Sequence, residues 1–223
     1  MRTEARGTSV TYSSRAHSHL AGEDSLLEFS GRTKRPAVRY AVFALISASG
    51  LIWDLWSKWA VFHWLNVPGQ FKVWKGSFLG IPINFDLATT FNLGALWGLG
   101  QGQTWLFASL SIIAIVVIAY FLWTGQAVES WWLTIASGLL LAGTMGNLYD
   151  RLGLHGWKDV NGQIYGVRDF LDFVFFNGGF HWATFNFADS YLVTGAIMLV
   201  LHSFWQPQQN PTPSTGVVNG PLP

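Results

Sequence analysis

Two aspartates in the C-terminal half of the sequence carry its strongest chemical signal. Asp169 lies in a polar stretch between two long apolar runs, and Asp189 lies at the start of the second run. Ionisable side chains at such places are energetically costly, so they point to function. Two carboxylates in a partly desolvated site share one proton, which leaves one acid and one base at neutral pH. Such a pair can activate a water molecule and later protonate a leaving amine.

The neighbouring carboxylates leave several interpretations open. Asp150 precedes Arg151, and we expect a charge pair between them at a helix end. Asp172 follows Asp169 by three residues, and this spacing does not decide which of the two faces inward. Asp189 could also be a helix N-terminal carboxylate that the helix dipole favours. The residues alone support an aspartate-pair enzyme and a small cation transporter or channel about equally.

Several other kinds of chemistry find no support in the sequence. There is no cysteine, which removes disulfides, thiolate catalysis and cysteine metal sites. The six histidines lack the spacing of a metal-binding motif, and we find no phosphate loop or cofactor fingerprint. A net charge of +1 argues against a nucleic-acid partner. We therefore expect neither a metal nor a cofactor.

The elements that position the aspartates are expected to span a membrane. Only 11% of the residues are charged and 50% are hydrophobic, whereas soluble domains carry about 25% charged residues. Apolar runs long enough to cross about 30 Å of bilayer occur at about 37–58, 105–123, 130–148 and 185–205. Basic residues before the first run predict a cytoplasmic N-terminus. The polar tails, 1–36 and 206–223, are expected to be disordered.

The segments between these runs have a different character. Residues 60–104 are broken by glycine and proline, which favours short strands at the membrane surface. Four crossings place this segment and residues 150–184 together on the side away from the termini. Asp54 and Lys58 are four residues apart and can pair on one helical face. Their pairing could anchor the helix end or take a direct part in the chemistry.

Five short motifs follow one another along the chain. They are DLWSK at 54–58, NLGA at 92–95, GNLYDR at 146–151, VRDF at 167–170 and FNFAD at 185–189. In this order they resemble the motifs of the lipoprotein signal peptidase (signal peptidase II) family. The resemblance covers about residues 38–205. It implies a membrane all-α bundle of four transmembrane helices, with a small extracytoplasmic β-cradle and a short periplasmic helix. Residues 37–205 would form this peptidase domain.

The resemblance also implies an activity and its partners. Such a protein is an aspartic endopeptidase of the bacterial inner membrane, with its active site near the periplasmic face. It removes the signal peptide from prolipoproteins by cleaving on the amino side of the diacylglyceryl-modified cysteine. Membrane lipid and globomycin-type inhibitors are the other expected partners, and we expect a monomer.

By the same resemblance, individual residues acquire roles. Asp169 and Asp189 match the catalytic pair, which favours Asp169 over Asp172. The expected substrate-binding residues are Asn92, Gly94, Asn147, Arg151 and Asn186. The expected supporting residues are Asp54, Lys58 and Asp150.

The sequence departs from the family pattern at three places. Extra residues, including 157–162, lie between Arg151 and Asp169, and Leu96-Trp97 replaces an Ala-Phe pair. Arg168 replaces an apolar residue, and a cation there should stabilise the ionised form of a neighbouring carboxylate. If Arg168 points at the pair, Asp169 is the expected base.

A catalytically inactive relative that captures lipidated peptides is the alternative from another functional class. The retention of both aspartates, each with its flanking motif, argues against it. A transporter is the third interpretation.

Overall fold

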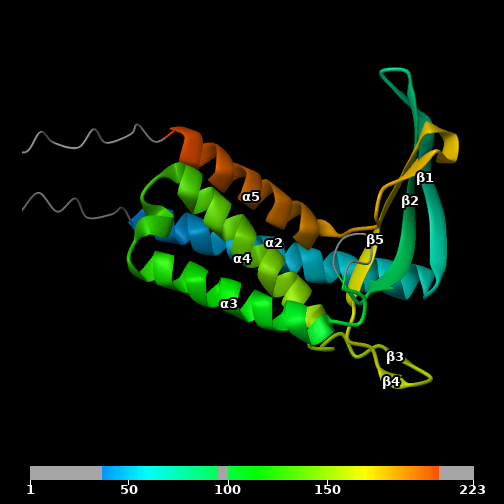
Figure 1. Cartoon of the computed structure of the whole chain (residues 1–223), viewed down its shortest axis with the longest axis horizontal. Helices are drawn as coiled ribbons and strands as arrows, with labels where there is room; N and C mark the ends of the chain where they lie inside the picture. The colour runs from blue at the N-terminus through cyan, green and yellow to red at the C-terminus, as the bar shows by residue number, and fades with distance from the viewer. Residues whose placement is uncertain (1–36, 95–99, 206–223) are drawn as a thin grey trace, which may run out of the picture. The chain divides into compact units, whose positions relative to one another are not determined.

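Four helices and an antiparallel sheet make up the computed structural model, which describes residues 37–94 and 100–205. The helices are α2 (Ala37–Leu65), α3 (Thr104–Trp123), α4 (Trp131–Arg151) and α5 (Phe187–Trp205). They run side by side, and the sheet lies across one end of them (Figure 1). The two tails, which the sequence predicts to be disordered, lie outside the described residues. Leu96-Trp97 also lies outside them.

Three of the four helices are long and apolar enough to cross a membrane. These candidate spans are Ala37–Leu65, Thr104–Trp123 and Phe187–Phe204. The remaining helix, α4, has a less apolar sequence. Many of its small and polar side chains are buried against the other helices, where they do not face lipid. Its buried residues include Thr134, Ser137, Thr144 and Asn147. The chain is thus a membrane protein with four helices, of which α4 is the least apolar.

Small residues on α4 let α2 and α5 approach closely. A Cβ atom at Gly143 would collide with the carbonyl oxygen of Ala188, in the first turn of α5. A Cβ atom at Gly146 would collide with the carboxylate of Asp54 on α2. These two glycines therefore bring the residues of three helices together at the end that faces the sheet.

The sheet has the strand order β1-β2-β5-β6, with every neighbouring pair antiparallel. Its strands are β1 (Gly69–Phe78), β2 (Ile81–Asn92), β5 (Val167–Phe175) and β6 (Phe180–His181). The prediction of strands within residues 60–104 is confirmed, although β1 and β2 are longer than expected. The first helix, in contrast, continues to Leu65 instead of ending near residue 58, because nothing breaks it before Asn66 and Pro68.

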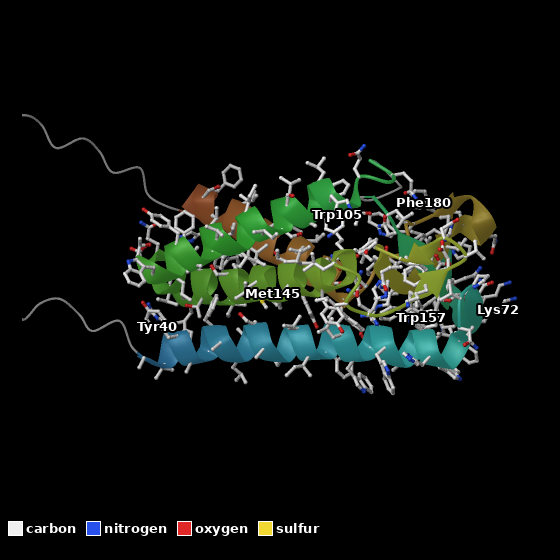
Figure 2. The ribbon with its side chains drawn as sticks, turned by 90° about the horizontal axis from the view of Figure 1, so that it is seen from below. Tyr40, Lys72, Trp105, Met145, Trp157 and Phe180 are labelled. Atoms are coloured by element: carbon white, nitrogen blue, oxygen red, sulfur yellow. The ribbon has the colours of Figure 1, made fainter. Side chains whose placement is uncertain are left out.

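Aromatic contacts fix the sheet to the end of α2. Trp64 and Phe71 lie 4.9 Å apart between ring centroids, and the fully buried Phe62 lies 5.3 Å from Phe91 on β2. The extra residues after α4 form a small hairpin of β3 (Lys158–Asp159) and β4 (Gly162–Gln163). The hairpin is held by Trp157, which lies against α2 beside Phe62 (Figure 2). Apart from the four long helices, the only helical segments among the described residues are short 3-10 turns, so the implied periplasmic helix is not found there.

Candidate active site

Asp169 is buried at the third position of β5, with only 1% of its surface exposed. Its Oδ1 accepts a hydrogen bond of 2.6 Å from the Asn186 side-chain amide, and the Asn92 side chain also bonds to this carboxylate. Burial raises the pKa of the Asp169 carboxyl well above its usual range, and the neighbouring charge of Asp189 raises it further. Asp169 is therefore suited to hold a proton at neutral pH.

Asp189 is half-buried in the first turn of α5, where a reciprocal cap fixes it. Its Oδ2 accepts from the backbone N–H of Asn186 at 3.2 Å, and the backbone N–H of Asp189 donates to the Asn186 Oδ1 at 3.0 Å. This is the capping-box arrangement of helix N-termini, here with asparagine and aspartate. The Asn147 side-chain amide donates to the Asp189 Oδ1 at 2.7 Å. Both carboxylate oxygens of Asp189 are thus held in place.

Asn186 joins the two aspartates through one side-chain amide. Its Oδ1 caps α5 at Asp189, so its Nδ2 is the group that faces Asp169. The residue is fully buried. The amide connects the strand that carries one carboxylate to the helix that carries the other, and the aspartate pair is one connected unit.

Lys58 lies beneath this unit and is completely buried. Its Nζ donates to the Asp54 Oδ2 at 2.7 Å and to the Asn147 Oδ1 at 3.1 Å, and it lies 3.2 Å from the Asp150 Oδ2. The three acceptors match the three hydrogens of an ammonium group. The predicted pairing of Asp54 with Lys58 is confirmed, and it lies in the protein interior.

Asp150 pairs with Arg168, and the expected pair with Arg151 is wrong. The Asp150 Oδ1 accepts from Arg168 Nε and Nη2 at 3.0 and 2.8 Å, and its Oδ2 accepts from the Arg168 backbone N–H at 3.0 Å. Consecutive helical residues do not face each other, which explains why Arg151 points elsewhere. Its guanidinium lies 5.4 Å from the ring centroid of Phe107, and its Nη2 lies 3.5 Å from the Gly94 carbonyl oxygen.

Asp54, Lys58, Asp150 and Arg168 form what we call the buried charge network, in which two positive charges face two negative ones. It contacts two residues next to Asp189, namely Ala188, which precedes it in the chain, and Asn147, which binds its carboxylate. The Asp54 Oδ1 accepts from the backbone N–H of Ala188 at 2.9 Å, and Lys58 holds the amide oxygen of Asn147. Arg168 points neither at the pair nor to water, because its buried guanidinium is bound to Asp150, so the condition under which Asp169 was the expected base is not met.

Asn92 and Gly94 lie at the edge of the pair, next to the end of β2. The Asn92 Oδ1 accepts from the Gly94 backbone N–H at 3.0 Å, which orients the Asn92 amide toward Asp169. Gly94 is buried and its carbonyl faces Arg151. All ten residues expected from the resemblance thus lie in or beside one connected cluster.

Asp172 is engaged elsewhere, so the structure brings Asp169 and not Asp172 to Asp189. The Asp172 Oδ1 lies 2.5 Å from the His181 Nε2 and accepts from Thr184 Oγ1 at 3.0 Å. Sequence reasoning missed His181 and Thr184, because the antiparallel pairing of β5 with β6 and the bridge between Leu171 and Phe185 bring them to Asp172.

Two pockets flank the aspartates and share Trp182. An apolar pocket of about 500 Å³ lies beside Asp189, and a more polar pocket of about 350 Å³ lies beside Asp169. The apolar pocket is lined mainly by Phe173, Phe175, Trp182, Phe185, Val193 and Thr194. The polar pocket is lined by Thr90, Asn92, Gln101, His181 and Thr184, among others. Within residues 37–94 and 100–205, no three histidine, aspartate or glutamate side chains are grouped to hold a metal ion.

Comparison with known proteins gives one consistent answer. The family described as signal peptidase (SPase) II matches residues 46–205. The lipoprotein signal peptidase of Rhodopirellula baltica is 43% identical over 171 residues, which cover 76% of this chain and 74% of the relative. That of Alteromonas mediterranea is 34% identical over 167 residues, covering 73% and 80%.

The fold is also found among solved structures. A structure described as a bacterial membrane enzyme matches with a TM-score of 0.58 at 23% identity, over 77% of this chain and 94% of the other. This chain belongs to the signal peptidase II family.

Proposed function

We propose that this chain is a membrane aspartic endopeptidase that removes the signal peptide from prolipoproteins. The observation that carries the proposal is the buried Asn186 amide, which links the carboxylates of Asp169 and Asp189 between two pockets. Family membership and the names of the relatives support the same activity. The cut would fall on the amino side of the diacylglyceryl-modified cysteine.

The environments of the two carboxylates differ enough to separate their roles. Asp169 is buried with a raised pKa, so it holds the shared proton and acts first as the acid. Asp189 is less buried, and amide groups hold both of its carboxylate oxygens in place, so we assign it the other role, that of the base that takes a proton from water. These roles are the reverse of those expected if Arg168 had pointed at the pair.

The reaction then needs no covalent intermediate. Asp189 takes a proton from water as the water oxygen bonds to the scissile carbonyl carbon, while Asp169 gives its proton to the carbonyl oxygen. When the tetrahedral intermediate collapses, Asp189 returns its proton to the leaving nitrogen as the C–N bond breaks. Asp169 regains a proton from one hydroxyl of the intermediate, and both groups are restored.

The two pockets fit the two parts of such a substrate. The apolar pocket beside Asp189 suits hydrocarbon, and it is continuous with the membrane-facing residues Val193 and Thr194 of α5. The polar pocket offers Asn92 and Thr184 to an extended backbone. Arg151, whose Nη2 lies 3.5 Å from the Gly94 carbonyl oxygen, would orient the chain around the scissile bond.

The membrane arrangement is part of the proposal. We infer four crossings, with α4 as the least apolar because its polar residues are covered by the other helices. Residues 37–205 then form one peptidase unit in the bacterial inner membrane, with a cytoplasmic N-terminus and the site near the periplasmic face. We propose that it acts as a monomer and binds globomycin-type inhibitors.

The test is cleavage of a diacylglyceryl-modified prolipoprotein by the purified protein beside Asp169→Asn and Asp189→Asn. Wild type should cleave, and each variant should lose at least about 100-fold in kcat, because each loses one proton-transfer group. Asp159→Asn, at an exposed position of the β3–β4 hairpin, should keep the turnover of wild type per folded protein. Cleavage by either pair variant at the wild-type rate would show that the pair is misassigned. A wild type that binds the substrate without cutting it would instead be a capture protein.

A further inference from the structure

Arg168 precedes Asp169 on β5 but points to the opposite side of the strand. Successive side chains of a strand alternate between its two faces, and here Asp169 faces Asn186 while Arg168 faces α4. The arginine is only 3% exposed. Its fork of Nε and Nη2 holds a single oxygen of Asp150, and its backbone N–H holds the other. Arg168 thus fastens the strand that carries Asp169 to the end of α4.

A continuous series of contacts leads from Arg168 to Asp189. Asp150, held by Arg168, lies 3.2 Å from the Lys58 Nζ. Lys58 donates to the Asn147 Oδ1 at 3.1 Å. Because that oxygen is fixed, the Asn147 Nδ2 is the group that faces Asp189, and it donates to the carboxylate at 2.7 Å.

The charge balance of the buried network explains why Arg168 matters to this series. With Arg168 present, two cations balance two carboxylates, and without it the network carries a net charge of −1. A buried charge that loses its partner is strongly destabilising. Asp150 would then compete for Lys58, which Asn147 now shares. Once its oxygen is released, the Asn147 amide can turn and no longer presents its Nδ2 to Asp189.

We propose that Arg168 is a positioning residue for the aspartate pair, acting through Asp150, Lys58 and Asn147. This inference rests on the proposed proteolytic function for its kinetic test. Arg168 touches neither aspartate side chain, so its effect is on the geometry of the pair and not on a proton-transfer step. Through its own backbone it fixes Asp169, and through the network it fixes Asp189.

The kinetic experiment compares Arg168→Met and Arg168→Lys in the intact, reconstituted protein. Arg168→Met should lower kcat by about 10- to 100-fold, the scale of a misplaced catalytic group, with KM changed less than about threefold because neither pocket is lined by this residue. Arg168→Lys keeps the charge and should recover part of the loss. The double variant Asp150→Asn/Arg168→Met restores a net charge of zero to the buried charge network. Its kcat should therefore be higher than that of Arg168→Met alone.

Arg39→Met is the matched control for lost stability. Arg39 donates to the backbone carbonyls of Val128 and Glu129 at the other end of the helices, so its loss weakens packing without touching the site. Its kcat per folded protein should equal that of wild type. If Arg168→Met behaves like Arg39→Met, with activity lost only in proportion to unfolded protein, the inference is overturned. An unchanged kcat in Arg168→Met overturns it equally.

A second measurement does not depend on activity. In protein labelled with ¹⁵N-asparagine, the side-chain amide resonances of Asn147 should move in Arg168→Met and stay in place in Arg39→Met. Asn147→Gln identifies these resonances. Unmoved resonances in Arg168→Met would contradict the proposed series of contacts from Arg168 to Asn147. If wild type does not cleave, the proposed function is refuted. The amide resonances then still test whether Arg168 positions Asn147.

Discussion

At the scale of single residues, Asn186 serves folding and chemistry with the same side chain. Its amide oxygen caps α5, and its amide nitrogen binds the carboxylate of Asp169. Amide groups offer a donor and an acceptor at once, which a serine or an aspartate at this position would not do in the same geometry. The two functions can therefore be separated by substitution.

Asn186→Ser should keep a helix cap and lose the bond to Asp169, whereas Asn186→Ala should lose both. We expect kcat to fall at least about 10-fold in both variants, because the pair is no longer held together. The free energy of unfolding of Asn186→Ala should be about 1 kcal/mol lower than that of Asn186→Ser, because an N-cap usually contributes this amount. Turnover and thermal unfolding measured side by side test this. Equal stabilities would contradict a capping function.

The raised pKa of Asp169 also predicts a dependence of stability on pH. Between the unfolded pKa of about 3.9 and the higher folded pKa, the folded protein binds more protons than the unfolded chain. Its free energy of unfolding therefore falls as the pH rises through this window, and the cost is fully present above the folded pKa. Asp169→Asn cannot ionise and should escape this cost.

We therefore expect Asp169→Asn to be inactive and yet to unfold at a temperature higher than wild type by at least about 2 °C at pH 7. The difference should shrink toward pH 4. Asp172→Asn gives the contrast, because it loses partners at His181 and Thr184 and should not gain stability. An Asp169→Asn protein that is less stable than wild type at pH 7 would show that the carboxyl is ionised without cost.

At the scale of elements, the site depends on how closely α4 approaches α5. Gly143 faces the carbonyl oxygen of Ala188, one residue before Asp189. Any side chain there must push the first turn of α5 away from α4. The bond between Asn147 and Asp189 crosses the same gap.

Gly143→Val should thus lower both the unfolding temperature and kcat, and we expect at least about 10-fold in kcat from the displaced carboxylate. Ala119→Ile is the control, because it also adds three carbon atoms, but at an exposed position of α3. Unchanged kinetics in Gly143→Val would mean that α5 yields without moving Asp189. Thermal unfolding measures the loss of stability, and kcat per folded protein measures the displacement of the Asp189 carboxylate, so the two measurements together separate these effects.

The elements and the pair could be predicted from the sequence much better than the partners of the charges. Apolar runs located all four helices, because length and hydropathy are local properties. The resemblance, rather than spacing, singled out Asp169, and the structure then brought it to Asp189. The partners of Asp150 and Asp172 could not be predicted, because Arg168 reaches Asp150 through the packing of β5 against α4, and His181 reaches Asp172 through the pairing of β6 with β5. The direction of Arg168 likewise follows from alternation along β5, whose register the sequence does not specify.

At the scale of the whole molecule, the number of crossings can be tested with single cysteines, because the chain has none of its own. Val160 is fully exposed at the tip of the β3–β4 hairpin, and Gln126 is exposed between α3 and α4. If α4 crosses the membrane, the two positions lie on opposite sides.

In intact cells with a permeable outer membrane, a membrane-impermeant maleimide should label Val160→Cys at once and Gln126→Cys only after lysis. Both variants should retain cleavage activity, since neither residue touches the site. Labelling of both from the same side would mean that α4 does not cross. The inferred position of the active site near the periplasmic face would then have to be abandoned.

The buried charge network has one further consequence, which concerns ionic strength. Dissolved ions screen exposed charges over about 8–10 Å at physiological salt, but they cannot enter a network whose lysine and aspartates are completely covered. The geometry of the aspartate pair should therefore be indifferent to the salt outside. We therefore expect the same turnover in dilute and in salty surroundings, which suits the proposed position of the site near the periplasmic face.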